Sequence, residues 1–284
     1  MLTHLRYFAI AIFYKKRNPK LGLKILLEKW SQDEFPDDFW NWWMENNQQL
    51  SDQWDYFSSK WIKFTYPGNW DYPEAFLKHL DTTPLLISYI GHPSWSKNFN
   101  LGVVGSRKIN SLTRDWINEE LYSFLSLNQV SIISGGARGV DQSAHLCALR
   151  SKQPTFVFLP SGLEKIYPSG LSDWQDEILN CGGAFISEYW PTEEIKKHYF
   201  IERNRLIASL SDFVLVAQGE LRSGTMLTAK WALELGRDLG VIPGHPKDSS
   251  FSGNLDLIRS GIQPIIDSQD LSFQISRFKK NEIV

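Results

Sequence analysis

Arginine and serine side chains next to glycines suggest a site for phosphate groups. Residues 134–141 read SGGARGVD, with three glycines and Arg138 in eight positions. Glycine lets the backbone turn tightly and approach a ligand, because it has no Cβ. The free N–H groups at the start of a following helix attract anions, and a guanidinium offers a fork of donors for phosphate. An ordinary strand–helix turn capped by Asp141 would explain the same residues.

The same combination recurs behind several apolar runs of the sequence. The residues that follow the first, second, third and fifth runs are, in that order, Gly105, Ser106 and Arg107; Ser134, Gly135, Gly136, Arg138 and Gly139; Pro160, Ser161 and Gly162; and Arg222, Ser223, Gly224 and Thr225. A sheet needs turns, but it does not need arginine and serine beside glycine at one strand end after another. We therefore expect these loops to converge on one polyanion site.

A second basic segment covers residues 197–205 and contains Lys197, Phe200, Arg203, Asn204 and Arg205. Cations in a groove bind backbone phosphates, and a flat ring such as that of Phe200 can stack on a base. Arg203 and Arg205 have an alternative structural role, which is to pair with nearby acids such as Glu188, Glu202 or Asp212.

Alternating strands and helices are expected to position these residues. Apolar runs lie at residues 101–105, 130–134, 156–159, 184–187, 213–217, 239–244 and 264–266, with helical patterns between most of them. They are apolar at both alternating positions, as in strands that are buried on two faces. The pattern predicts an α/β fold with a Rossmann-like, doubly wound, mostly parallel sheet. Ligands of such sheets bind beyond the carboxyl ends of the strands.

The N-terminal part has a different composition, because seven of the twelve tryptophans fall within the first 70 residues. Trp54, Phe57, Trp61 and Phe64 are spaced as one stripe on a helix, which we interpret as the core of a small helical bundle. Few lysines or arginines interleave with them, which disfavours a base-stacking surface. The predicted organisation is a helical domain at 1–64, a connecting segment with one strand at 65–98, the Rossmann-like domain at 99–268 and a tail at 269–284.

Composition limits the classes of function. The 284 residues carry a formal net charge of −2, so a nucleic-acid site must be a local basic patch. Cys147 and Cys181 form no disulfide framework or zinc spacing, which favours the reducing cytoplasm and predicts no metal. No apolar run approaches the roughly 20 residues that cross a bilayer, and we expect no cofactor.

Seven motifs occur in a fixed order between residues 66 and 266: GSR at 105, SGGARGVDQSAH at 134, GLEKIYP at 162, SE at 187, FIERNRLIASLSD at 200, RSGTMLTAKWALELGRDLGVIPG at 222 and GNLDLIRSGIQPI at 253. This array resembles the DNA processing protein A (DprA, or Smf) family. The resemblance implies a non-catalytic, homodimeric protein that binds single-stranded DNA and helps to load the RecA recombinase in natural transformation. It implies a DNA site made of Gly105, Ser106, Arg107, Ser134, Gly135, Gly136, Arg138, Gly139, Lys197, Phe200, Arg203, Asn204 and Arg205.

The sequence departs from the family pattern at two points, and two alternative functions remain open. Ile201 replaces the usual proline of the family, and the winged-helix domain of many members has no counterpart after residue 266. A nucleotide-binding or nucleotide-hydrolysing enzyme of a related fold would need an acid beside the ribose, for which Glu188 is the candidate. The glycine turns of a purely structural adaptor would serve packing alone.

Overall fold

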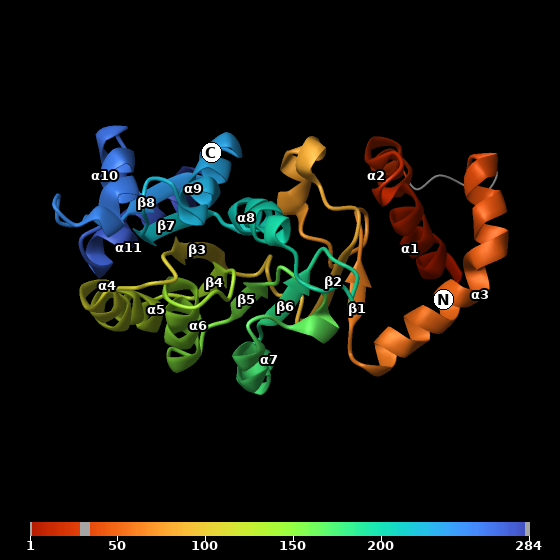
Figure 1. Cartoon of the computed structure of the whole chain (residues 1–284), viewed down its shortest axis with the longest axis horizontal. Coiled ribbons are helices and arrows are strands. Elements are labelled where there is room, and N and C mark those ends of the chain that lie inside the picture. The colour runs from red at the N-terminus through yellow and green to blue at the C-terminus, as the bar shows by residue number, and fades with distance from the viewer. Residues whose placement is uncertain (1, 29–34, 282–284) are drawn as a thin grey trace.

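A nine-stranded sheet forms the centre of the computed structural model, which describes residues 2–28 and 35–281 (Figure 1). The strand order is β1-β2-β6-β5-β4-β3-β7-β8-β9. The strands are β1 (Lys63–Thr65), β2 (Ile87–Gly91), β3 (Phe99–Gly105), β4 (Val130–Ser134), β5 (Thr155–Phe158), β6 (Ala184–Ser187), β7 (Phe213–Gln218), β8 (Asp238–Val241) and β9 (Gln263–Pro264). All seven runs predicted as strands from residue 101 onward are strands of this sheet.

The seven strands from β3 to β9 pair in parallel, and β1 and β2 extend the sheet with antiparallel pairs next to β6. The chain reverses its direction of travel across the sheet after β6, because β7 pairs on the far side of β3. The carboxyl ends of β3, β4 and β7 therefore lie side by side, at the place where ligands bind in open α/β sheets.

Helices cover both faces of the sheet. On one face, α8 (Lys197–Leu210) and α9 (Gly224–Glu234) pack against buried residues such as Val104, Val214 and Val216. On the other face, α5 (Tyr122–Leu127), α6 (Val140–Arg150) and α11 (Ser268–Asn281) pack against Leu101, Ile132 and Leu215. Figure 1 shows these two layers above and below the central strands. The predicted doubly wound α/β fold is confirmed.

Three further helices complete this part of the chain. α4 (Ser111–Trp116) continues through a π turn (Ile117–Leu121) into α5, α7 (Gln175–Asn180) precedes β6, and α10 (Ser252–Arg259) precedes β9. None of the helices in the described part of the chain combines the length and the apolar character needed to cross a bilayer.

The N-terminal helices α1 (Leu2–Lys15), α2 (Pro19–Glu28) and α3 (Asp37–Ser59) lie at one end of the sheet (Figure 1). Their aromatic side chains form a core, as predicted, but this core is shared with the sheet. Phe8 packs against Trp54 and Phe64, and the same cluster of buried residues includes Phe185 of β6.

The predicted helical stripe is wrong at its second half. α3 ends at Ser59, and Trp61 follows with a φ of 61° and a side chain that is 77% exposed. The left-handed backbone at Trp61 turns the chain, so that Phe64 enters the three-residue strand β1 instead of extending the helix. A three-residue strand is too short to give an alternating pattern, so the sequence showed no sign of it.

The sheet crosses both predicted boundaries of the connecting segment. Residue 64 lies inside β1, and residue 98 lies between β2 and β3, which are strands of one sheet. The segment at 65–98 therefore contributes an integral strand. The predicted tail begins within α11, whose Leu271 and Ile275 are buried against the sheet; residues 282–284 lie outside the described residues.

Candidate functional site

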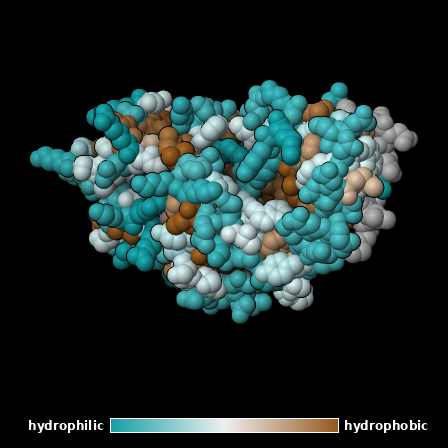
Figure 2. Space-filling model, turned by 45° about the vertical axis from the view of Figure 1, so that its right-hand side comes forward, coloured by the Kyte–Doolittle hydropathy of each residue, from teal (hydrophilic) through white to brown (hydrophobic). Residues whose placement is uncertain are grey.

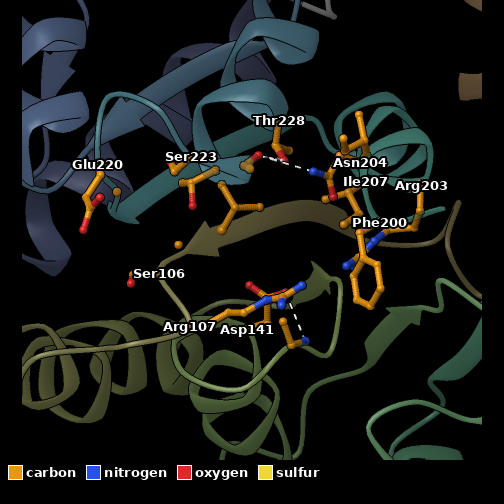
Figure 3. A pocket seen from close by; sticks show the side chains of 17 residues that line it. Ser106, Arg107, Asp141, Phe200, Arg203, Asn204, Ile207, Glu220, Ser223 and Thr228 are labelled. Carbon is orange, nitrogen blue, oxygen red and sulfur yellow. Dashed lines mark hydrogen bonds between the residues drawn. The ribbon is translucent and has the colours of Figure 1, made fainter. Parts of the chain in front are cut away.

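A cavity of about 290 Å³ opens beyond the carboxyl ends of β3 and β7 (Figure 3). Four segments line it: the end of β3, the turn between β4 and α6, the first turns of α8, and the turn between β7 and α9. Of the predicted site residues, six line the cavity directly, namely Gly105, Ser106, Arg107, Phe200, Arg203 and Asn204. Three of the four loops that were expected to converge, those after β3, β4 and β7, therefore meet at this cavity. The fourth loop does not, because Pro160, Ser161 and Gly162 after β5 are absent from its lining.

The turn after β4 packs against the loop after β3. The Val140 N–H donates to the Ser106 carbonyl oxygen at 3.1 Å. Gly139 adopts a φ of +87°, and a Cβ there would lie 2.3 Å from the same oxygen. Only glycine fits this position, because both the backbone conformation and the close approach exclude a side chain.

Asp141 does not cap the helix, contrary to the prediction. The N-cap position of α6 is Gly139, and Asp141 lies within the first turn. Its carboxylate points back into the loop, where it accepts a hydrogen bond from the Ala137 N–H at 3.2 Å. Asp141 is also 7% exposed, so it holds the shape of the turn from beneath.

Arg203 lies beneath the turn and is 4% exposed. Its Nη1 donates to the Phe158 carbonyl oxygen at 3.2 Å, and the charge of Asp141 acts on it. A Cβ at Gly135 would lie 1.4 Å from Nη1 of Arg203. Gly135 therefore provides the space for this guanidinium. Of the two roles left open for Arg203 by the sequence, burial beneath the turn favours the structural one, and the acid whose charge acts on it is Asp141.

Burial dominates the electrostatics below the cavity. It lowers the pKa of Arg203, and the carboxylate of Asp141 opposes this effect. Burial likewise raises the pKa of Asp141, against the charge of Arg203 and the hydrogen bond from Ala137. Burial and the charge of Arg203 lower the pKa of His145 to about 3. His145 is fully buried and contacts Thr155 through Nδ1 at 2.6 Å, so it is a hydrogen-bonded packing residue.

Arg107 and Phe200 lie together at the mouth of the cavity (Figure 3). The guanidinium carbon of Arg107 is 4.9 Å from the centre of the Phe200 ring, and Arg107 is exposed. Tyr167 meets the same ring edge-on, with the ring centroids 5.8 Å apart. A cation and an aromatic ring that touch at an open mouth can receive a phosphate and an adjacent base.

Some of the remaining predicted residues support the turn after β4, and others are exposed outside the cavity. Ser134 is fully buried and donates its hydroxyl to the Val103 carbonyl oxygen at 2.6 Å. Gly136 takes a φ of +73° in the turn. Arg138 and Lys197 are exposed but do not line the cavity itself. Predicted residues therefore build the turn, whereas the cationic side chains of Arg138 and Lys197 lie outside the cavity.

Arg205 belongs to a different place. It pairs with Glu188 at 2.5 Å, the pairing that the sequence left open, and both side chains line a separate cavity on the other side of α8. Glu188, the acid named for the enzyme alternative, is thus tied in an ion pair outside the cavity at β3 and β7. Within the described ranges, no three His, Cys, Asp or Glu side chains are grouped so as to hold a metal ion.

The turn after β7 was expected near the site through Ser223, Gly224 and Thr225, whereas Glu220 and Thr228 were missing from the prediction. Glu220, Ser223, Gly224, Thr225 and Thr228 line the cavity, and Figure 3 shows Glu220 and Ser223 across from Phe200. Asn204 connects the two walls, because its Nδ2 donates to the Gly224 carbonyl oxygen at 3.3 Å. The signal for three of them was present, since Ser223, Gly224 and Thr225 belong to the loop that follows the fifth apolar run.

Comparison with known proteins agrees with this arrangement. The profile of the DNA recombination-mediator protein A family matches residues 63–276, which include every residue that lines the cavity. The chain belongs to this family. The DNA processing protein DprA of Streptococcus pneumoniae is 34% identical over 206 residues, which cover 72% of this chain and 70% of that protein. Protein Smf of Borreliella burgdorferi is also 34% identical, over 204 residues that cover 72% of this chain. The match spans 63% of the length of that relative.

Solved structures of the recombination-mediator family extend the likeness. The crystal structure of the S. pneumoniae protein has a TM-score of 0.73 at 27% identity, and the match covers 94% of this chain and 92% of that one. Because it covers 94%, the likeness includes much of the N-terminal helical region, which lies before the profile match. The Helicobacter pylori DNA processing protein A, described for its single-stranded DNA binding mode, has a TM-score of 0.66 at 27% identity over 76% of this chain and 96% of that one.

Proposed function

We propose that the cavity beyond β3 and β7 binds single-stranded DNA, and that the chain is a non-catalytic DNA-binding protein. The contact of exposed Arg107 with Phe200 at the mouth of the cavity carries this proposal. Cationic side chains bind the phosphates of a single strand, and aromatic rings stack on its bases. Arg107 and Phe200 supply both, with the guanidinium carbon 4.9 Å from the ring centre. The H. pylori relative, described for its single-stranded DNA binding mode, has the same fold at 27% identity.

The residues have different roles in this proposal. Arg107, Phe200, Asn204 and Ser106 contact the strand, and Arg138 and Lys197 bind phosphates at the rim. Arg203, Ser134 and the glycines at 105, 135, 136 and 139 hold the turns in shape. Arg205 is not assigned to the DNA site.

The wider function follows from the family. We propose that the chain acts in the cytoplasm as a homodimer that protects incoming single strands and helps RecA to load on them. Sedimentation velocity tests the dimer, and RecA filament formation on oligo-dT, with and without the chain, tests the loading. A monomer at micromolar concentration, or filaments that form at the same rate with and without the chain, would contradict the respective part.

Replacement of Arg107 by alanine tests the DNA site. We expect Arg107→Ala to bind oligo-dT about tenfold more weakly, and the slope of log affinity against log salt to fall by about 0.7, as for one lost phosphate contact. Lys97→Ala, which removes an exposed cation outside the cavity, is the matched control. Unchanged affinity in a folded Arg107→Ala variant would remove Arg107 from the site.

A separate assay tests the absence of catalysis. Nucleoside monophosphate hydrolysis would release free base from AMP, and Glu188→Gln would abolish it. We expect no turnover, because Glu188 is held by Arg205 away from the cavity. Sustained release of adenine that depends on Glu188 would overturn the non-catalytic assignment.

A further inference from the structure

A second and larger cavity, of about 890 Å³, lies where the N-terminal helices meet the sheet. Its walls come from the end of α1, from the segment between β6 and α8, and from the face of α8 that points away from the DNA site. Figure 2 shows a depression on this side of the molecule, with apolar side chains at depth between hydrophilic ones. The volume lies in the range of small-molecule sites, which favour junctions of this kind.

Two partly buried cations line this cavity and have hydrogen-bond donors that are not in use. The ammonium of Lys15 donates to the backbone carbonyl of Glu188, and an ammonium carries three N–H groups in all. Arg205 uses Nη2 for its 2.5 Å bond to the Glu188 carboxylate. Its Nη1 is buried and finds no hydrogen-bond partner among residues 2–28 and 35–281. Buried donors of this kind are costly unless something accepts from them.

The charges around the cavity favour a dianion. Five cationic side chains line it, against three carboxylates. Glu188 is paired with Arg205, and Glu193 with Lys196. The charged side chains that remain outside these two pairs are Lys15, Lys16, Arg17 and Glu202. The excess of two positive charges matches a phosphate monoester, which carries about −1.5 to −2 at pH 7, better than a diester with a single charge.

The rest of the wall is apolar and aromatic. Ile12, Phe64, Leu86 and Trp190 line the cavity, and Phe64 and Leu86 are each 5% exposed. The Trp190 ring stacks on Phe64 with the centroids 5.8 Å apart. Such a surface suits the body of a molecule that is apolar or planar at one end and doubly charged at the other.

A smaller hollow adjoins this cavity and the DNA site. It shares Lys15, Glu188, Glu202 and Arg205 with the second cavity, and Ile201 with the DNA site. Ile201 is 51% exposed and lies between them. A ligand of the second cavity could therefore be a separate small molecule, or the terminus of a strand whose neighbouring part occupies the DNA site.

We propose that the second cavity binds a phosphate monoester carried on a nucleoside. Lys15 and Arg205 bind the phosphate at depth, Lys16 and Arg17 attract it at the mouth, and the apolar wall receives the nucleoside. Two sources supply this chemistry: a free nucleoside monophosphate and the 5′-phosphorylated end of a DNA strand. The second source rests on the proposed DNA-binding function, whereas the first does not.

Calorimetric titration of the full chain with dTMP tests the site. The titration is made on Arg107→Ala, so that the DNA site contributes little. We expect one dTMP per chain, no binding of thymidine, and a Kd about tenfold weaker in Lys16→Glu/Arg17→Glu, since two attractive charges become repulsive. Both substituted residues are exposed, so the fold should persist. Lys97→Glu/Lys247→Glu makes the same charge change at exposed positions outside the cavity and should leave the Kd unchanged.

A second titration distinguishes the two sources. Oligo-dT with a 5′-phosphate is compared with the same oligonucleotide bearing a 5′-hydroxyl, on the parent chain and on Lys16→Glu/Arg17→Glu. A several-fold preference for the phosphate in the parent alone identifies the strand end as the ligand. No preference, together with saturable dTMP binding, identifies the free nucleotide. Failure of dTMP to bind, or equal binding by Lys16→Glu/Arg17→Glu, overturns the proposal, and oligo-dT binding by the parent reports separately on the DNA site.

Discussion

The guanidinium of Arg203 fills the space that a Cβ of Gly135 would need. The distance from that ideal Cβ to Nη1 would be 1.4 Å, far inside any van der Waals contact. Arg203 itself is held by the Phe158 carbonyl oxygen and by the charge of Asp141. The glycine turn and α8 therefore pack against each other through the buried Arg203 side chain. A substitution in the turn should displace Arg203, and a substitution of Arg203 should disturb the turn.

Gly135→Ala should displace this cation and destabilise the fold. Overpacking and displacement of a buried, hydrogen-bonded cation together cost about 3 kcal/mol, and the free energy of unfolding can be measured with urea. Gly170→Ala is the matched control, because a Cβ at Gly170 meets nothing within 4 Å and should change stability by less than about 0.5 kcal/mol. If both variants are equally stable, Arg203 moves at little cost, and the proposed fit is wrong.

Asp141 and Arg203 should be energetically coupled. Asp141→Asn leaves a buried cation without its counter-charge, and Arg203→Met leaves a buried carboxylate; each should cost about 3 kcal/mol. The double variant should cost less than the sum by 1 kcal/mol or more, because the second change removes the charge that the first left unpaired. Urea unfolding of all four proteins gives the coupling energy directly. A purely additive cycle would mean that the two charges do not stabilise each other.

The sequence predicted the strands and the turns of the site because both leave local signals. Apolar runs of three to six residues indicated every parallel strand, and the glycines at 135 and 139 marked the turn that the structure contains. The sequence did not show that Arg203 points inward and Arg138 outward, since side-chain direction depends on how α8 packs against the turn. For the same reason Asp141 was expected to cap α6, whereas it holds the preceding loop.

The sequence did not predict how the N-terminal region joins the sheet. Its aromatic residues were expected to form a core of their own, but the fold shares that core with β6 and adds β1 and β2 to the sheet. Sharing a core is a long-range property that spacing along one helix cannot reveal. The pairing of Arg205 with Glu188 was considered from the sequence, but the cavity that they line with Lys15 depends on contacts across about 170 residues of sequence.

His145 should make stability depend on pH. Burial lowers its pKa from 6.5 to about 3 in the folded protein, so below pH 6.5 the unfolded chain binds a proton that the folded chain does not. The contribution of His145 to the free energy of unfolding is therefore fully present above pH 6.5. Between pH 6.5 and about pH 3 it falls by up to about 1.4 kcal/mol per pH unit as the pH decreases. His145→Asn should flatten the difference in the free energy of unfolding between pH 7.5 and pH 5.5. Parallel pH profiles for parent and variant would show that His145 takes up its proton in the folded state as readily as when unfolded.

Phe200 and Arg107 should contribute to DNA binding in distinguishable ways. Phe200→Leu removes the ring but no charge, so the affinity for oligo-dT should fall by the 1–3 kcal/mol of about one base stack, while the salt dependence stays as in the parent. Arg107→Ala should change the salt dependence, since it removes a cation. Because the guanidinium lies 4.9 Å from the ring, the double variant should fall short of additivity. Fluorescence anisotropy at several salt concentrations measures both quantities. A salt slope that changes in Phe200→Leu would show that the ring acts by orienting Arg107, and base stacking at this position would then be excluded.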